Sequence, residues 1–241
     1  MEKDGKKKKR HVGLLILAAI LLVLLAAAVI IYAMYIRETV YVPDKYEAPP
    51  TPTPEVSGAP EPTPYVKRTP VMMYFTKKKI SFPIETVGII PYTDKEGNVI
   101  KDEDGETVYT MDTADSAKVA AWLEDSASPG EYGNAIFTGH SSFRHVAGVF
   151  SVLPDMRVGE EIIVKYDDGS TMAFIVTSVY IRSIYDMPEN VMKYDTGDSR
   201  MTLNTDYGES WNSGLGTRNQ RCVVIAKPKD KSQIIMPPAD E

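Results

Sequence analysis

Cysteine and histidine are scarce in this sequence. Cys222 is the only cysteine among 241 residues, so no intramolecular disulfide can form. The three histidines are His11, His140 and His145. A metal site would need further ligands at helical or strand spacing around them, and the sequence shows none. We therefore predict neither a metal ion nor another cofactor.

The start of the chain has a net positive charge, whereas the remainder has a net negative charge. The first ten residues carry a net charge of +4 and the whole chain carries −6, which leaves −10 for the remainder. An acidic surface repels phosphate backbones. Nucleic acid is therefore not an expected partner, and the basic start needs a different explanation.

One uncharged hydrophobic stretch, residues 12–36, directly follows the basic residues 1–11. A helix rises about 1.5 Å per residue, so roughly 25 residues span about 37 Å, enough to cross a bilayer with some tilt. The hydrophobic part of a signal peptide is usually shorter, although the small residues Ala26 to Ala28 would permit cleavage. Basic residues mark the cytoplasmic side of a membrane helix. We expect a single-pass anchor in the cell membrane, with residues 1–11 in the cytoplasm and the rest extracellular.

The next segment, residues 37–70, is rich in proline, and nine of the 17 prolines lie between positions 43 and 70. It has too few large apolar residues to build a core, and proline-rich chains favour the extended polyproline II conformation. At ~3.1 Å per residue, such a segment reaches up to roughly 80 Å. We expect an extracytoplasmic linker that places the following domain within or beyond a cell wall.

Residues 71–235 consist of short β-rich runs separated by turns, and residues 236–241 form a short tail. We expect strands at 79–91, 134–140, 200–206 and 221–228, a hairpin at 160–184, and polar turns at Gly97-Asn98 and Asp104-Gly105. Acidic side chains near these turns fit a solvated surface better than a calcium site. A short helix is expected at 115–126, and a short helix or turn at 146–156. The domain is predicted to be all-β, a closed β-barrel of seven to eight strands with one or two short helices.

Three polar residues lie at or beside the predicted strand ends. His140 ends one strand, Asp206 ends another, and Arg221 begins the last. Rigid strands hold catalytic groups well while the adjoining loops admit a substrate. The three residues offer an acid or base, a carboxylate and a cation. Unrelated polar residues at strand ends are the alternative interpretation.

Five motifs in a fixed order resemble the sortase family, the cysteine transpeptidases of Gram-positive cell surfaces. They are "ISFPIETVGIIP", "GNAIFTGH", "GVFSVLPDMRVGEEIIVKYDDG", "MTLNT" and "TRNQRCVVIA". The similarity covers about residues 78–230. No single motif is specific, but their order and spacing together are. The hydrophobic anchor and the proline-rich linker also fit this family.

The resemblance implies a substrate and a mechanism. Sortases cleave LPxTG-like sorting signals of surface proteins and transfer them to cell-wall or pilin amines. A cysteine thiolate attacks the amide, a histidine protonates the leaving amine, and an arginine stabilises the oxyanion. Carried onto this chain, the histidine is His140 and the arginine is Arg221, which also contacts substrate together with Thr205. The position of the nucleophile is Asp206.

An aspartate at position 206 conflicts with this mechanism. A carboxylate that attacked an amide would have to form an acyl anhydride while expelling a poor leaving group. An ion pair between Asp206 and Arg221 is expected instead. Cys222 adjoins Arg221, but successive strand residues face opposite sides, so we expect Cys222 to face the barrel interior.

Three interpretations follow from this conflict. The first is an active sortase lineage in which position 206 has changed. The second is a non-catalytic sortase-like module that binds sorting signals or pilin subunits. The third is a hydrolase in which Asp206 and His140 activate water. The segment Ile184–Ser199 is expected to shape the groove that selects the signal.

Overall fold

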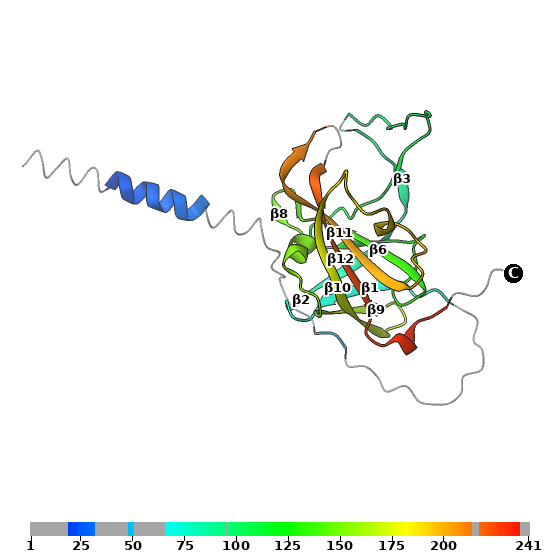
Figure 1. The fold of residues 1–241 in the computed structure, drawn as a ribbon. Helices are drawn as coiled ribbons and strands as arrows, with labels where there is room; N and C mark the ends of the chain where they lie inside the picture. Colours follow the sequence, from blue (N-terminus) through cyan, green and yellow to red (C-terminus); the bar gives the residue numbers. More distant parts are fainter. Residues whose placement is uncertain (1–18, 32–47, 51–65, 95, 214–216, 237–241) are drawn as a thin grey trace, which may run out of the picture. The chain divides into compact units, whose positions relative to one another are not determined.

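The computed structural model describes residues 19–31, 48–50, 66–94, 96–213 and 217–236 (Figure 1). The chain divides into two units, Met1–Thr39 and Val40–Glu241. Residues 19–31 are helical. No helix in the described part of the chain is both long and apolar enough to cross a membrane. Most of the expected anchor and linker lies outside the described residues.

The second unit contains a closed barrel of eight strands in the order β1-β2-β5-β6-β11-β12-β10-β9 (Figure 1). This confirms the predicted all-β barrel. The strands are β1 (Pro70–Phe75), β2 (Ile80–Val87), β5 (Ala120–Leu123), β6 (Gly133–Gly139), β9 (Glu161–Tyr166), β10 (Thr171–Ser183), β11 (Ser199–Asn212) and β12 (Thr217–Pro228).

Small elements lie between the barrel strands. Two separate two-stranded sheets pair β3 (Ile89–Pro91) with β4 (Tyr109–Met111), and β7 (Ser142–Phe143) with β8 (Val146–Ala147). The helices in the described part of this unit are short 3-10 turns: η1 (Val149–Asp155), η2 (Glu189–Val191) and η3 (Lys231–Gln233). The first of them confirms the short helix or turn predicted at 146–156.

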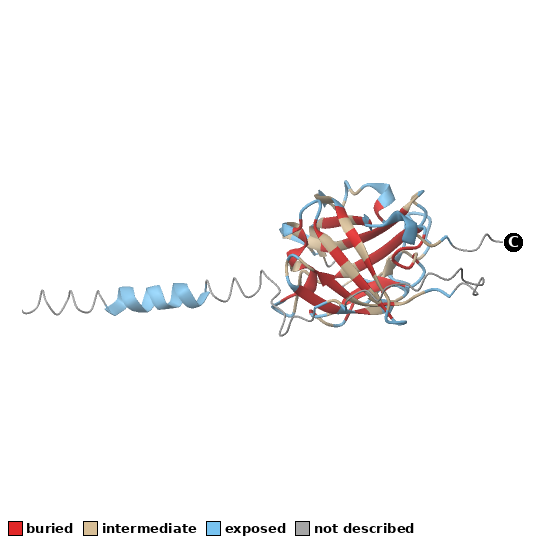
Figure 2. Ribbon diagram, turned by 90° about the horizontal axis from the view of Figure 1, so that it is seen from below, coloured by how far each residue is buried: buried red, intermediate tan, exposed pale blue. Residues whose placement is uncertain are grey.

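The barrel interior is a continuous apolar core, and buried positions run along the strands (Figure 2). Phe75 and Phe82 pack edge to face with ring centroids 5.2 Å apart, and Phe150 of η1 packs against both at 6.4 and 5.8 Å. Offset and edge-to-face aromatic contacts of this kind stabilise a core beyond their area alone. The turn η1 is therefore fixed to the interior by its own side chain.

The helix predicted at 115–126 is wrong. Residues Ala120–Leu123 form β5, and all four are buried between β2 and β6. A strand that is buried on both faces shows no alternation of polar and apolar residues, so a short apolar run of this kind can be mistaken for part of a helix. Just before this strand, the Ser116 hydroxyl accepts a hydrogen bond from the Lys118 N–H in a local turn and caps no helix.

The polar turns between β3 and β4 are confirmed. Asp94 and Asp102 each accept hydrogen bonds at Oδ1 from two backbone N–H groups ahead of them in the chain. Gly97 and Gly105 adopt positive φ angles of 86° and 82°, which side chains disfavour. Both hairpin turns are therefore closed by an aspartate and a glycine.

Two parallel pairings determine which side chains come together. β5 lies parallel to β2, and β11 lies parallel to β6, while the remaining barrel pairs are antiparallel. Asn204 of β11 lies beside Thr138 of β6, and Asp206 lies opposite Arg221 of β12. The end of β6 and the middle of the β11–β12 pair therefore meet on one side of the barrel.

Candidate active site

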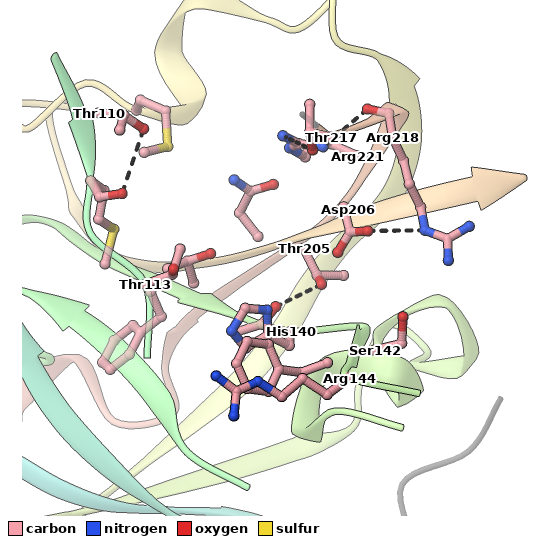
Figure 3. Close-up of a pocket in the computed structure, with 17 residues that line it drawn as sticks. Thr110, Thr113, His140, Ser142, Arg144, Thr205, Asp206, Thr217, Arg218 and Arg221 are labelled. Carbon is pink, nitrogen blue, oxygen red and sulfur yellow. Dashed lines mark hydrogen bonds and ion pairs between the residues drawn. The ribbon is translucent and has the colours of Figure 1, made fainter. Parts of the chain in front are cut away.

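A pocket of about 500 Å³ lies where β6, β11 and β12 meet (Figure 3). Its lining includes His140, Asp206 and Arg221, so the structure brings together the three residues singled out from the sequence. Arg144 and Arg218 also line it. Side chains from separate parts of the chain thus converge on one cavity.

Asp206 is engaged on both of its carboxylate oxygens. Its Oδ2 lies 3.0 Å from Nε of Arg218 (Figure 3). Its Oδ1 accepts a hydrogen bond of 2.8 Å from the Ser141 hydroxyl. The predicted ion pair with Arg221 is wrong. The strand register places the two residues opposite each other, but the carboxylate turns to Arg218 instead.

Arg221 is held by neutral groups. Its Nη2 donates to the Thr217 hydroxyl at 2.9 Å, and its Nη1 donates to the carbonyls of Arg218 and Gln220, each at 3.3 Å. Burial lowers the pKa of Arg221, while the charge of Asp206 acts in the opposite direction. A guanidinium nevertheless stays charged in proteins. The pocket therefore contains a partly desolvated cation without a direct counter-ion among the described residues.

His140 is oriented by Ala114 and Phe143 and not by the charged residues of the pocket. Its Nε2 lies 2.7 Å from the carbonyl of Ala114, and its ring stacks on Phe143 with centroids 4.5 Å apart. In the neutral form, Nε2 must carry the proton to donate to that carbonyl. Within the described residues, no hydrogen bond joins His140 to Asp206. The two line the same pocket without being hydrogen-bonded to each other.

The backbone around His140 is tightly constrained. Arg144 and His145 have φ angles of 49° and 65° in the tight turn between β7 and β8, a region that side chains rarely adopt. Gly148 lies so close to the His140 carbonyl that an added Cβ would overlap it. The Phe150 N–H donates to the same carbonyl at 3.1 Å. The start of η1 therefore fixes the end of β6.

Cys222 lies in the core, and Thr205 lines the pocket with its hydroxyl already engaged. Cys222 has no exposed surface and belongs to the apolar core, which confirms the predicted orientation. Burial raises the pKa of its thiol to about 12, with Asp155 adding a smaller contribution. Thr205, expected to contact substrate, is 2% exposed, and its hydroxyl donates to the Gly139 carbonyl at 2.7 Å. Neither side chain presents a free reactive group to the pocket.

Arg218, Ser141 and Arg144 were missed by sequence reasoning. Ser141 and Arg144 follow His140 closely, which is the only sequence signal for them. Arg218 meets Asp206 near an irregularity in the β11–β12 pairing, between Tyr207 and Trp211. Such a bulge redirects side chains and leaves no clear trace in residue spacing. Positions near a predicted strand end are therefore worth including in a site.

A second, mainly apolar pocket of about 450 Å³ adjoins the first. The two share Thr110, Met111 and Met192, and the second is also lined by Leu123 and Ile136. The charged cavity thus continues into an apolar one, and the β3–β4 hairpin lines both. A long ligand can place a polar group in one pocket and an apolar group in the other.

The segment Ile184–Ser199 reaches this groove through Met192, as expected. Asn134 of β6 anchors it, because its side-chain amide donates to the carbonyls of Val191 and Lys193, each at 3.0 Å. Asn134 Oδ1 in turn accepts a 2.7 Å hydrogen bond from Thr202. The loop is therefore tied to β6. Within the described part of the chain, no three histidine, cysteine or acidic residues gather as they would around a metal ion.

The family model for the sortase domain matches residues 89–229 of this sequence. A search of curated proteins gave no match. The chain is similar to solved structures of a lid mutant of Streptococcus agalactiae sortase C1 (16% identity, TM-score 0.44), Corynebacterium diphtheriae sortase A (19%, 0.47) and a Clostridium perfringens sortase D5 transpeptidase (17%, 0.44). The similarity covers 66%, 72% and 67% of this chain and 69%, 64% and 79% of those chains, respectively. Because the domain model matches more than half of its residues, the chain belongs to the sortase family.

Proposed function

We propose that this chain binds LPxTG-like sorting-signal peptides in the charged pocket and, as it stands, does not transfer them. The observation that carries the proposal is that His140, Asp206 and Arg221 line one pocket whose lining has no thiol. The family resemblance assigns substrate contacts to this position. The groove is therefore retained while the nucleophile is replaced by Asp206.

The chemistry of position 206 argues for binding without transfer. Covalent transfer needs a nucleophile that forms an acyl-enzyme intermediate, from which an amine then takes the acyl group. A carboxylate would have to form an anhydride, and both oxygens of Asp206 are already engaged by Arg218 and Ser141. The only thiol, Cys222, lies in the core with its pKa raised to about 12. A reactive thiolate is therefore unavailable.

A second function, thiol-dependent transpeptidation to cell-wall or pilin amines, would belong to a form of the chain with cysteine at position 206. Arg221 and His140 line the pocket at positions suited to this chemistry. His140 would have to exchange its contact with the Ala114 carbonyl for the leaving amine. No contact between Asp206 and His140 supports a hydrolase in which the two activate water, because Asp206 bonds to Arg218 and Ser141 instead.

The location of the protein is also part of the proposal. Residues 12–36 would form a single-pass membrane anchor, with residues 1–11 in the cytoplasm. Residues 37–70 would carry the barrel outward to the cell wall, where sorting signals and amine acceptors are found. The uncharged length of residues 12–36 and the basic residues before it support this proposal.

The test compares the chain with its Asp206→Cys variant, using a fluorogenic LPxTG-type peptide for cleavage and a labelled peptide for affinity. We expect the unaltered chain to bind without forming an acyl-enzyme detectable by mass spectrometry. Recovery of cleavage in Asp206→Cys would favour an active lineage, and continued inactivity with binding retained would favour a dedicated binding module. The absence of binding in both would refute the proposed function. Turnover by the unaltered chain that needs Asp206 and His140 would establish the hydrolase instead.

A further inference from the structure

The charged pocket has an excess of positive charge inside an acidic protein. Arg144, Arg218 and Arg221 line it, and Asp206 is the only acidic residue among the described residues of its lining. The whole chain carries a net charge of −6. A cavity lined by one sign of charge attracts ligands of the opposite sign, because its walls focus the field. The ligand of this pocket should therefore carry negative charge.

Two of the three arginines have no carboxylate partner in the described part of the chain. Asp206 is occupied by Arg218. The guanidinium of Arg221 meets a hydroxyl and two carbonyls, and that of Arg144 lies 5.0 Å from the centroid of the Phe143 ring. A buried or half-buried cation gains most from a charged acceptor. Arg221 in particular is placed to receive an anion.

We propose that the pocket binds a carboxylate of a peptide ligand at Arg221, with Arg144 adding to the attraction, and that the peptide's apolar residues occupy the adjoining pocket. The inference rests on the proposed function and narrows it. The preferred ligand is an acidic peptide, either one that ends in a free carboxylate or one that carries an acidic side chain. A sorting-signal peptide with neither a free C-terminal carboxylate nor an acidic side chain would bind more weakly.

The adjoining pocket favours a peptide over a small inorganic anion. Its lining includes Leu123 and Ile136, and it shares Met111 and Met192 with the charged cavity. A ligand that fills both must combine an anionic group with apolar side chains on an extended chain. Inorganic phosphate satisfies only the first requirement, so it should compete poorly with the peptide.

Asp206 limits the affinity for such a ligand in this scheme. Its carboxylate opposes a second carboxylate nearby, and it occupies Arg218. Replacing it with asparagine removes the negative charge and releases a further guanidinium. Asp206→Asn should therefore raise the affinity for a carboxylate, a gain that an unfolded variant cannot produce.

The experiment measures affinities of the full-length chain, in detergent, for three labelled peptides. They are Leu-Pro-Ala-Thr with a free carboxylate, the same peptide with a C-terminal amide, and amide-capped Leu-Pro-Glu-Thr. Hydrogen bonds to charged groups are stronger than neutral ones, so we expect roughly tenfold tighter binding of an acidic peptide than of the neutral amide. The difference should shrink when salt rises from about 0.05 M to about 0.5 M.

Substitutions in the pocket test which residues cause the preference for an acidic peptide. Arg221→Gln and Arg144→Gln should each reduce the preference for the acid, and Asp206→Asn should increase it. Arg157→Gln is the matched control, because Arg157 is exposed, bonds to the Pro154 and Met156 carbonyls and does not line the pocket.

Each result leads to a separate conclusion. Tighter binding of the free-terminus peptide identifies a C-terminal carboxylate as the ligand group, and tighter binding of the glutamate peptide identifies an acidic side chain. Either preference supports the inference if Arg221→Gln removes that preference. Equal affinity for all three peptides overturns the inference but leaves peptide binding intact. If none of the peptides binds, the proposed function fails and the inference fails with it.

Discussion

Asp206 illustrates how one side chain can be held firmly without being important for stability. Its partners Arg218 and Ser141 fix both oxygens, yet the Arg218 and Asp206 side chains keep 32% and 24% of their surface exposed. Ion pairs that remain in contact with water contribute little free energy, because solvent screens the attraction. The polar contacts of the pocket therefore set its chemistry more than its folding.

We accordingly expect Arg218→Gln and Asp206→Asn each to change the free energy of unfolding by less than about 1 kcal/mol. Urea denaturation followed by circular dichroism measures this, with Arg157→Gln as the control for removing a positive charge elsewhere. A loss of several kcal/mol in either pocket variant would mean that the pair supports the barrel as well as the site.

Cys222 provides a second test at the scale of one residue. Because its thiol is buried and its pKa is raised to about 12, it should not react with an aromatic disulfide reagent at pH 8 while the protein is folded. The same thiol should react fully in denaturant. It is the only cysteine, so the colour change reports this site alone. Rapid labelling of the folded chain would contradict the assigned orientation.

The same shift predicts a pH dependence of stability. The folded thiol holds its proton to about pH 12, whereas the unfolded thiol loses it near its ordinary value. Since the folded pKa is raised, this contribution is complete below the unfolded pKa and disappears as pH rises towards the folded value. We expect the free energy of unfolding to fall less steeply between about pH 9 and 11 in Cys222→Ala than in the unaltered chain. Parallel pH profiles would contradict the shift.

At the scale of elements, the strands that meet at the pocket were found from the sequence, but not all of their ends. The runs predicted at 134–140, 200–206 and 221–228 coincide with parts of β6, β11 and β12, and this was enough to bring three pocket residues together. β6 does end beside His140, but Asp206 and Arg221 lie inside β11 and β12 and not at their ends. Sequence reasoning therefore misplaced two strand ends.

Sequence reasoning failed at Ala120–Leu123, because burial on both faces removes the alternation that identifies a strand. Sequence reasoning also paired Asp206 with Arg221, whereas the structure pairs it with Arg218. The irregular pairing of β11 with β12 that brings Arg218 to Asp206 depends on the tertiary structure and is not visible in residue spacing.

The junction between β6 and η1 yields a prediction about the site's geometry. Gly148→Ala would place a methyl group on the His140 backbone, so we expect a destabilisation of about 1–3 kcal/mol and a displaced imidazole. The matched control is Gly88→Ala, where nothing lies within 4 Å of the added Cβ. Thermal unfolding and the NMR shifts of His140 measure the two effects. Equal stability of both variants would show that the chain relaxes around Gly148.

At the scale of the whole molecule, the barrel domain is tied to the segment just before its first strand. Lys67 donates to the carbonyls of Glu124 and Ser126, and the guanidinium of Arg68 lies 4.2 Å from the centroid of the Tyr166 ring. These residues fall within the expected linker 37–70, whose last part therefore belongs structurally to the barrel. Composition marked the proline-rich segment but not the place where contacts with the domain begin.

A truncation series tests this boundary. A chain that starts at Val66 should unfold cooperatively, whereas one that starts at Val71 loses the Lys67 and Arg68 contacts and the first residue of β1. We expect the shorter chain to be less stable by roughly 1–3 kcal/mol. Urea midpoints and slopes compare the two. Equal midpoints would place the functional boundary at residue 71, as composition alone suggested.

The parallel pairing of β6 with β11 has a consequence for how the protein is made. Thr205 and Gly139, which share a hydrogen bond across this pair, are separated by 66 positions, and β12 must still be added beyond β11. Non-local strand pairs form slowly, because the intervening chain has to be ordered first. While the polypeptide is being synthesised, β6 can pair with β5, but its other edge stays unpaired until β11 emerges in the last quarter of the chain. The newborn protein is most exposed to aggregation during this interval, and its pocket is among the last parts to be completed.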